Sequence, residues 1–216
     1  SSVGPEASSG RIAPQLMAPG NDVAASLGPP SSYGCKSLSD DQTDPVDCDV
    51  QIGINGTSLA APAAAGAAML VRDYFAQGFY PTGVQILANQ HLEISGALVK
   101  ALLVASADFM NGQGVGLSDL FRGNNEQGWG RIQIDEVLPL QSWPAAANGL
   151  LVVDGETAAL RNSFGNGTID GDIDATVGPG NLQSSTFEVC DRDQELRLAL
   201  VYTEAAGASL DGSMLN

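Results

Sequence analysis

Ser58 is the residue whose surroundings are best suited to chemistry. It follows an alternating segment, residues 50–54, that predicts a strand, and then a turn that contains Gly56. A helix is predicted to begin at Ser58, where the first backbone N–H groups have no partner in the helix and the helix dipole is positive. Such a position suits an oxyanion, and Pro62, which has no N–H, loosens the first turn. The segment can therefore hold a nucleophilic hydroxyl beside an oxyanion site.

A simpler interpretation is that Ser58 only caps the helix. Serine is favoured at helix N-caps, and helix chemistry alone favours this interpretation over a catalytic one. The nucleophile elbow of α/β-hydrolases reads Gly-x-Ser-x-Gly, whereas residues 56–60 read Gly-Thr-Ser-Leu-Ala. That family is disfavoured, and the local pattern leaves both interpretations of Ser58 open.

Two helices are predicted to support this site. No polar side chain occurs from Leu59 to Val71, so the first helix, which is predicted to stop at Gly78, should be buried on every side. A second helix is predicted from about Ser95 to Ala107, where leucine and alanine recur at helical spacing.

The chain changes character near residue 140. Residues 1–34 are short extended pieces interrupted by glycine and proline, and residues 35–49 form an acidic loop. After a linker over 139–148, apolar residues separated by turn signals predict an all-β region. The predicted strands are Leu150–Val153, Ala158–Arg161, Ser185–Cys190 and Leu196–Tyr202. We therefore expect an α/β domain over residues 1–140 and a partial β-sandwich over residues 141–216.

Residues 56–62, Gly-Thr-Ser-Leu-Ala-Ala-Pro, resemble the nucleophile motif of the subtilisin-like serine peptidases, the subtilase family. In that family the motif reads Gly-Thr-Ser-Met-Ala-x-Pro, and a helix of small residues follows. Leu59 replaces the usual methionine, and Ala63 replaces the histidine that often follows the proline. Residues 1–5 and 17–20 resemble segments that precede the nucleophile in the family. The motif is specific and favours the catalytic interpretation of the serine.

The resemblance covers nearly the whole chain and implies a fold. The second helix and residues 128–131, Gly-Trp-Gly-Arg, resemble the end of the family's catalytic domain, an α/β domain with a mostly parallel sheet. Residues 196–204, with Leu215 and Asn216, resemble the jelly-roll-like β-sandwich that follows this domain in some extracellular members. The chain is expected to be the C-terminal part of a subtilisin-like domain followed by a truncated β-sandwich.

The same resemblance implies a serine endopeptidase that acts on peptides or proteins through an acyl-enzyme on Ser58. The family order is Asp, His, Ser, so the Asp and His of the triad and the oxyanion Asn are expected upstream of this chain. His91, the only histidine, follows Ser58 and is interpreted as a surface or loop residue. Asn55 is interpreted as part of the serine motif and not as the oxyanion Asn.

The chain alone is expected to be inactive and to fold poorly. An unassisted serine hydroxyl is a weak nucleophile at neutral pH. Without preceding strands, water should reach much of four apolar side chains of the first helix, Leu59, Met69, Leu70 and Val71. The alternative function is that of a non-catalytic family member whose fold and β-sandwich serve binding.

The composition restricts the partners. Nine basic and 25 acidic residues give the 216-residue chain a net charge of −16, which repels phosphate backbones and anionic membrane surfaces. No nucleic-acid partner and no membrane partner are therefore predicted. No apolar run reaches the roughly 18 residues that a transmembrane helix needs. The oligomeric state stays open.

Cysteines and acidic residues bear on the compartment and on metals. Cys35 and Cys48 share a short polar loop, and a disulfide between them would imply an oxidising, secreted or extracellular location. Two unpaired thiols are the alternative, and Cys190 is expected to be free. Residues 170–174, Asp-Gly-Asp-Ile-Asp, offer oxygen ligands for a structural Ca²⁺, and a solvated acidic turn is the alternative. The peptidase chemistry requires no cofactor.

Overall fold

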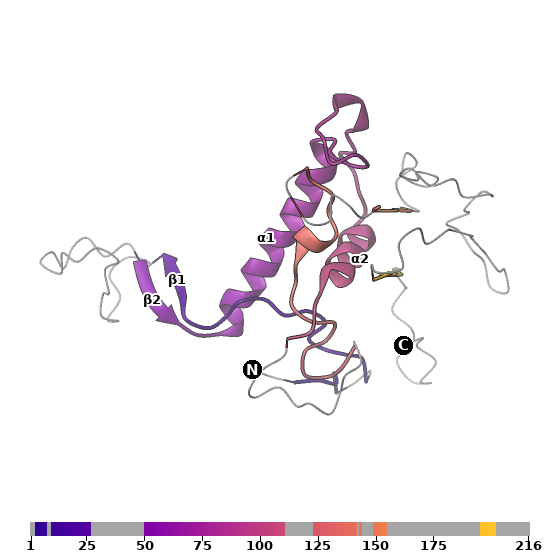
Figure 1. The fold of residues 1–216 in the computed structure, drawn as a ribbon. Coiled ribbons are helices and arrows are strands. Elements are labelled where there is room, and N and C mark those ends of the chain that lie inside the picture. The colour runs from indigo at the N-terminus through magenta and orange to yellow at the C-terminus, as the bar shows by residue number, and fades with distance from the viewer. Residues whose placement is uncertain are drawn as a thin grey trace, which may run out of the picture.

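The computed structural model contains two α-helices, a two-stranded ribbon and two short 3-10 helices within the residues it describes (Figure 1). Those residues are 3–7, 10–26, 50–110, 123–141, 143, 149–154 and 195–201. In chain order, the elements are β1 (Val23–Ser26), β2 (Val50–Ile54), α1 (Thr57–Ala76), η1 (Leu87–Asn89), α2 (Gly96–Ser106) and η2 (Ile134–Glu136). The ribbon lies at the N-terminal end of α1, and α2 packs beside its C-terminal half. Among these residues, no helix has the length and apolar character that crossing a membrane requires.

The strand at residues 50–54 and both predicted helices are confirmed. α1 begins at Thr57 and ends at Ala76, and Gly78 follows with a φ of 78°, a left-handed conformation that glycine adopts without strain. α2 begins after Ser95, whose Oγ accepts a hydrogen bond from the Leu98 N–H at 3.0 Å. Ser95 is therefore the N-cap of α2.

A hydrophobic core joins the C-terminal half of α1 to α2. Its buried members are Val71, Tyr74, Phe75, Tyr80, Ile94, Leu98, Val99, Leu102, Leu103, Leu138 and Val152. The Tyr74 hydroxyl donates to the Pro139 carbonyl at 2.9 Å, which ties α1 to the segment after η2. Burial raises the pKa of Tyr74 well above its usual range, and Tyr80 raises it further, so the phenol keeps the proton that it donates.

α1 is not buried on every side, contrary to the sequence-based expectation. Met69 is 64% exposed, Leu70 is 57% exposed and Leu59 is half-buried, in agreement with the prediction that water reaches these side chains. The sequence also predicts that water reaches Val71, and that prediction is wrong because Val71 is fully buried in the core. The cause is that the core covers only one face of the C-terminal half of α1, the face that carries Val71, Tyr74 and Phe75.

The described sheet is an antiparallel ribbon, whereas the family resemblance predicts a mostly parallel sheet. β1 pairs with β2 so that Val23 lies opposite Ile54, and the register is irregular directly after Val23. A parallel bridge joins Met17 to Arg131 outside this ribbon. A parallel sheet needs strands linked by long crossovers, and the two strands within the described ranges are consecutive and pair antiparallel.

The β-sandwich and the domain division at residue 140 stay predictions. Residues 150–153 and 196–201, which belong to two of the predicted strands, are in no strand. A strand needs a hydrogen-bonded neighbour, and the other two predicted strands, residues 158–161 and 185–190, lie outside the described residues. Three further predictions also lie outside the described residues: the disulfide between Cys35 and Cys48, the free thiol of Cys190, and the calcium ligands of residues 170–174.

Candidate functional site

Ser58 is an exposed residue in the first turn of α1. The N-cap of α1 is Gly56, in an extended conformation, and no side chain makes a capping hydrogen bond. The interpretation of Ser58 as an N-cap is therefore wrong. The Leu59 N–H donates to the Gly56 carbonyl at 3.1 Å, whereas the N–H groups of Thr57 and Ser58 come before the first bond within the helix. The site thus combines an exposed hydroxyl with backbone donors that can bind an oxyanion.

Two hydrogen bonds fix the turn that precedes Ser58. The Asn55 Oδ1 accepts from the Asp22 N–H at 2.7 Å, and the Gly56 N–H donates to the Gly20 carbonyl at 2.8 Å. Asp22 has a φ of 54°, a left-handed conformation that aspartate adopts more readily than most residues. The side chain of Asn55 therefore holds the turn against the segment before β1.

Gly20 permits the close approach of these two segments. A Cβ at Gly20 would lie 2.8 Å from the Gly56 carbonyl oxygen and 3.2 Å from the Cβ of Ala60. A Cβ at Gly56 would have Ser58 N, at 3.8 Å, as its nearest heavy atom, so the close approach depends on Gly20 and not on Gly56. Residues 17–20 resemble the family in sequence, and the only local sign of this contact is that Gly20 follows a proline.

The Gly-Trp-Gly-Arg segment, residues 128–131, packs against the chain that leads to β1. The Met17 N–H donates to the Gly130 carbonyl at 2.8 Å, beside the parallel bridge between Met17 and Arg131. A Cβ at Gly130 would lie 2.4 Å from the carbonyl oxygen of Asp108, just after α2, so this packing requires glycine. Two segments that resemble the family in sequence are thus adjacent in space.

His91 lies near the opposite end of α1 from Ser58. Its ring centroid is 6.5 Å from that of Phe75 and 6.4 Å from that of Tyr80, and its N–H donates to the Phe75 carbonyl at 2.9 Å. Because an α-helix rises 1.5 Å per residue, Ser58 and Phe75 lie about 25 Å apart along the helix axis. Burial lowers the pKa of His91 and favours the neutral imidazole. The distance nevertheless excludes His91 as the base for Ser58.

One cavity within the described region does not include the nucleophile candidate. It has a volume of about 340 Å³ and is lined by Asp108, Phe109, Met110 and Arg131, without Ser58. Within the described ranges, no group of three or more His, Cys, Asp or Glu side chains is placed to hold a metal ion. The candidate site therefore consists of the exposed hydroxyl, its turn and the segment that holds the turn.

The sequence model of the subtilase family matches residues 1–167 of the chain. The match includes the Ser58 turn, both helices and residues 128–131, whereas residues 195–201 lie beyond it. No solved structure matches the chain.

Similar proteins from Dictyostelium discoideum include three that are named serine protease/ABC transporter B family proteins. The protein tagD is 33% identical over 146 residues, which is 62% of this chain and 8% of tagD. The protein tagA is 28% identical over 213 residues, 97% of this chain and 10% of tagA. The protein tagB is 30% identical over 146 residues, 62% of this chain and 7% of tagB. The chain thus spans a tenth or less of the length of these relatives.

Proposed function

Because this chain belongs to the subtilase family, we propose that it is part of a serine endopeptidase in which Ser58 is the nucleophile. The observation that carries the proposal is the exposed hydroxyl of Ser58 in the first turn of α1. The turn before it is held by hydrogen bonds of Asn55 and Gly56, as a reacting group requires. The proposed substrates are peptides or proteins.

The proposed reaction is acyl transfer in two steps. The Ser58 Oγ attacks the scissile carbonyl carbon while a general base takes its proton. The base gives this proton to the leaving amine, the C–N bond breaks, and an ester remains on Ser58. Water then attacks the ester with help from the same base and releases the acid. N–H groups of the first turn of α1, such as that of Ser58, would stabilise the oxyanion in both steps.

We propose that the general base comes from sequence that precedes Ser58 in the full-length protein. His91, the only histidine in the sequence, lies beside Phe75 and too far from Ser58 to act. The family order places both the His and the Asp of the triad before the Ser. The exposed apolar side chains of Met69 and Leu70 support this proposal, since further strands of an α/β domain would cover them. The 216 residues alone should then be inactive.

A non-catalytic family member is the second candidate. The observation that favours it is the large distance between Ser58 and His91. In that case the fold and the C-terminal region serve binding. The names of the relatives combine a protease with a transporter, and we propose only a peptidase role for this chain, which spans a tenth or less of their length.

We further propose a secreted or extracellular location and a β-sandwich over residues 141–216. The support for the location is the pair Cys35 and Cys48 in one short polar loop, and the support for the sandwich is the alternating pattern after residue 148. A Ca²⁺ ion at residues 170–174 would be structural, since the proposed acyl transfer needs no metal.

Activity-based labelling of the full-length gene product tests the catalytic proposal. A fluorophosphonate reacts with an activated serine, and peptide mapping should place the adduct on Ser58. Ser58→Ala should abolish labelling and lower peptide hydrolysis by several orders of magnitude, with an unchanged circular dichroism spectrum. Labelling at another serine would contradict the assignment. A folded protein with neither labelling nor hydrolysis would favour the non-catalytic candidate.

A further inference from the structure

The N-terminal end of α2 binds an acidic side chain from a distant part of the chain. The Asp154 Oδ2 accepts a hydrogen bond from the N–H of Ser95, the N-cap residue, at 2.8 Å. Asp154 is only 3% exposed, so water competes little for this contact. An acidic group is also favourable at the positive end of the helix dipole.

The C-terminal end of α2 binds a basic side chain from farther along the chain. The Arg197 Nη1 donates to the Ala105 carbonyl at 3.3 Å, and the Arg197 Nη2 lies 4.0 Å from the Asp108 Oδ1. The same guanidinium is held by Glu195, with 3.0 Å between Nη2 and Oε2. The last carbonyl groups of a helix have no partner within it, and a cation is favourable there.

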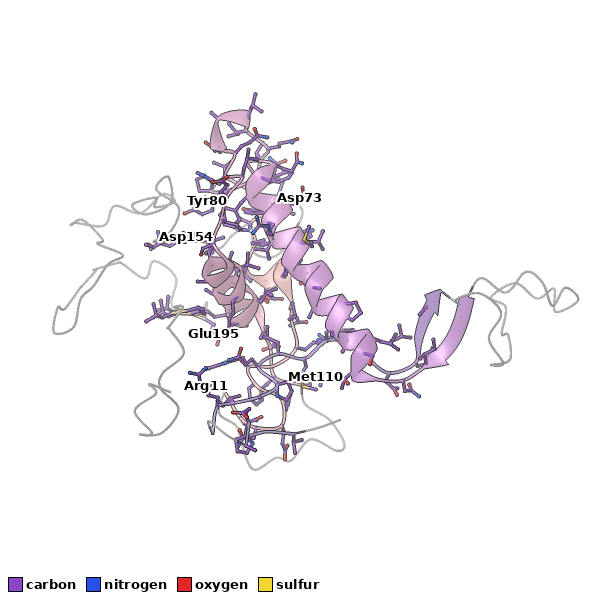
Figure 2. The ribbon with its side chains drawn as sticks, turned by 180° about the vertical axis from the view of Figure 1, so that it is seen from behind. Arg11, Asp73, Tyr80, Met110, Asp154 and Glu195 are labelled. Atoms are coloured by element: carbon purple, nitrogen blue, oxygen red, sulfur yellow. The ribbon has the colours of Figure 1, made fainter. Side chains whose placement is uncertain are left out.

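Both side chains come from the region that the sequence predicts to be a separate domain. Val152, in the same segment as Asp154, is buried in the core of α1 and α2. Arg197 lies beyond residue 167, where the match to the subtilase family ends. Figure 2 shows Asp154 and Glu195 near opposite ends of α2. Asp154 and Val152 lie within the family match and Arg197 lies beyond it, so segments on both sides of residue 167 contact α2 or the core.

We propose that residues 149–154 and 195–201 form an intramolecular interface that braces α2 at both of its ends. Residues 149–154, within the family match, and residues 195–201, beyond it, then stabilise α2 from its two ends. We call the pair Asp154 and Arg197 the α2 brace. The brace complements the helix dipole at each end, so its loss should open α2 locally before the rest of the domain.

Hydrogen exchange in the full-length gene product tests the brace. Asp154→Ala and Arg197→Gln should each increase amide exchange in the peptide covering residues 95–106 by about tenfold or more, because each removes a hydrogen bond to a helix end. Exchange in residues 57–66 should stay unchanged. Lys100→Gln is the matched control, since it removes a charge from the exposed middle of α2 and replaces one good helix former by another.

Conservative variants keep the test decisive if the first variants do not fold. Asp154→Asn keeps an acceptor oxygen and Arg197→Lys keeps a charge, so their effects should be smaller than those of the Ala and Gln variants. Added salt should weaken the Arg197 contact more than the Asp154 contact, because Arg197 is the more exposed of the two. The proposal is overturned by unchanged exchange of α2 in both variants. It is also overturned by an equal increase across the whole chain, or by an equal increase in Lys100→Gln.

Discussion

Gly20→Ala tests whether the position of the Ser58 turn controls activity. The Gly20 carbonyl accepts the Gly56 N–H at 2.8 Å, directly before the helix that carries the nucleophile candidate. A Cβ added at Gly20 would lie 2.8 Å from the Gly56 carbonyl oxygen and 3.2 Å from the Cβ of Ala60. The new methyl group therefore contacts Gly56, which precedes Ser58, and Ala60, which follows it.

The size of the expected effect follows from these distances. Ordinary van der Waals contacts begin at 3.4 Å, so the Gly20 segment and the turn must separate by about 0.6 Å. Overpacking of this kind lowers the free energy of unfolding by about 1–3 kcal/mol. A displacement of about 1 Å can lower a rate about 100-fold, so kcat/KM should fall by about tenfold or more.

The assay compares activity with stability in the full-length gene product. Peptide hydrolysis and the rate of fluorophosphonate labelling report on Ser58, and thermal unfolding reports on the fold. Gly96→Ala is the matched control, because Gly96 is the exposed first residue of α2 and an added Cβ there meets nothing within 4 Å. The control should keep full activity and lose no stability, since alanine favours a helix more than glycine does.

Two results would refute this reasoning. Full activity of Gly20→Ala with an unchanged melting temperature would show that the turn is insensitive to its neighbour. If the unfolded fraction of Gly20→Ala fully accounts for its loss of activity, the folded molecules of the variant keep the turn in place. In either case the contact with Gly56 would not position Ser58.

Three further predictions concern the surface of α1, the histidine and the cysteines. Leu70→Gln should lower the free energy of unfolding of the full-length product by about 1.5–3 kcal/mol, because further strands should cover the exposed side chain of Leu70 in that product. A change below about 0.5 kcal/mol in a denaturant titration would contradict the presence of these strands. Burial lowers the pKa of His91, so the unfolded chain binds more protons than the folded one below about pH 6.5, and the free energy of unfolding should fall as the pH decreases through this value. Denaturant titrations at several pH values should show a weaker pH dependence for His91→Gln than for the unchanged protein, and an equal pH dependence would contradict this prediction. Peptide mapping without reduction should find Cys35 joined to Cys48, a disulfide that stabilises the folded state by about 3 kcal/mol in the chain-entropy model. Alkylation of both thiols without reductant would count against an oxidising compartment.

The elements around the site were predictable because their signals are local. The alternation over residues 50–54, the apolar run that stops before Gly78 and the cap at Ser95 each involve only neighbouring residues. The helix boundary was less predictable, since the cap is Gly56 and not Ser58. Local pattern does not fix a helix terminus to the residue.

The contacts between distant segments were not predictable from the sequence. Asp22 bonds to Asn55 across 33 residues, and Arg197 bonds to Ala105 across 92 residues. In both pairs one partner is a backbone group, which every residue type can supply, so the sequence carries no signal for it. The exposure of Leu70 was equally hidden, because Leu70 and the buried Val71 are neighbours in one apolar run and only the packing decides which face of α1 is covered.

The position of Ser58 at the far end of α1 sets a requirement on the proposed peptidase. α1 is anchored in the core at its C-terminal half, where the Tyr74 hydroxyl donates to the Pro139 carbonyl. Since Ser58 lies about 25 Å from that anchor, a tilt of about 2° would displace it by about 1 Å, enough to impair catalysis. A second anchor is therefore needed at the N-terminal end, and the contacts of Gly20 and Asp22 with the turn supply part of it. Further segments of the full-length protein can supply the rest of that anchor by packing on the exposed apolar face of α1.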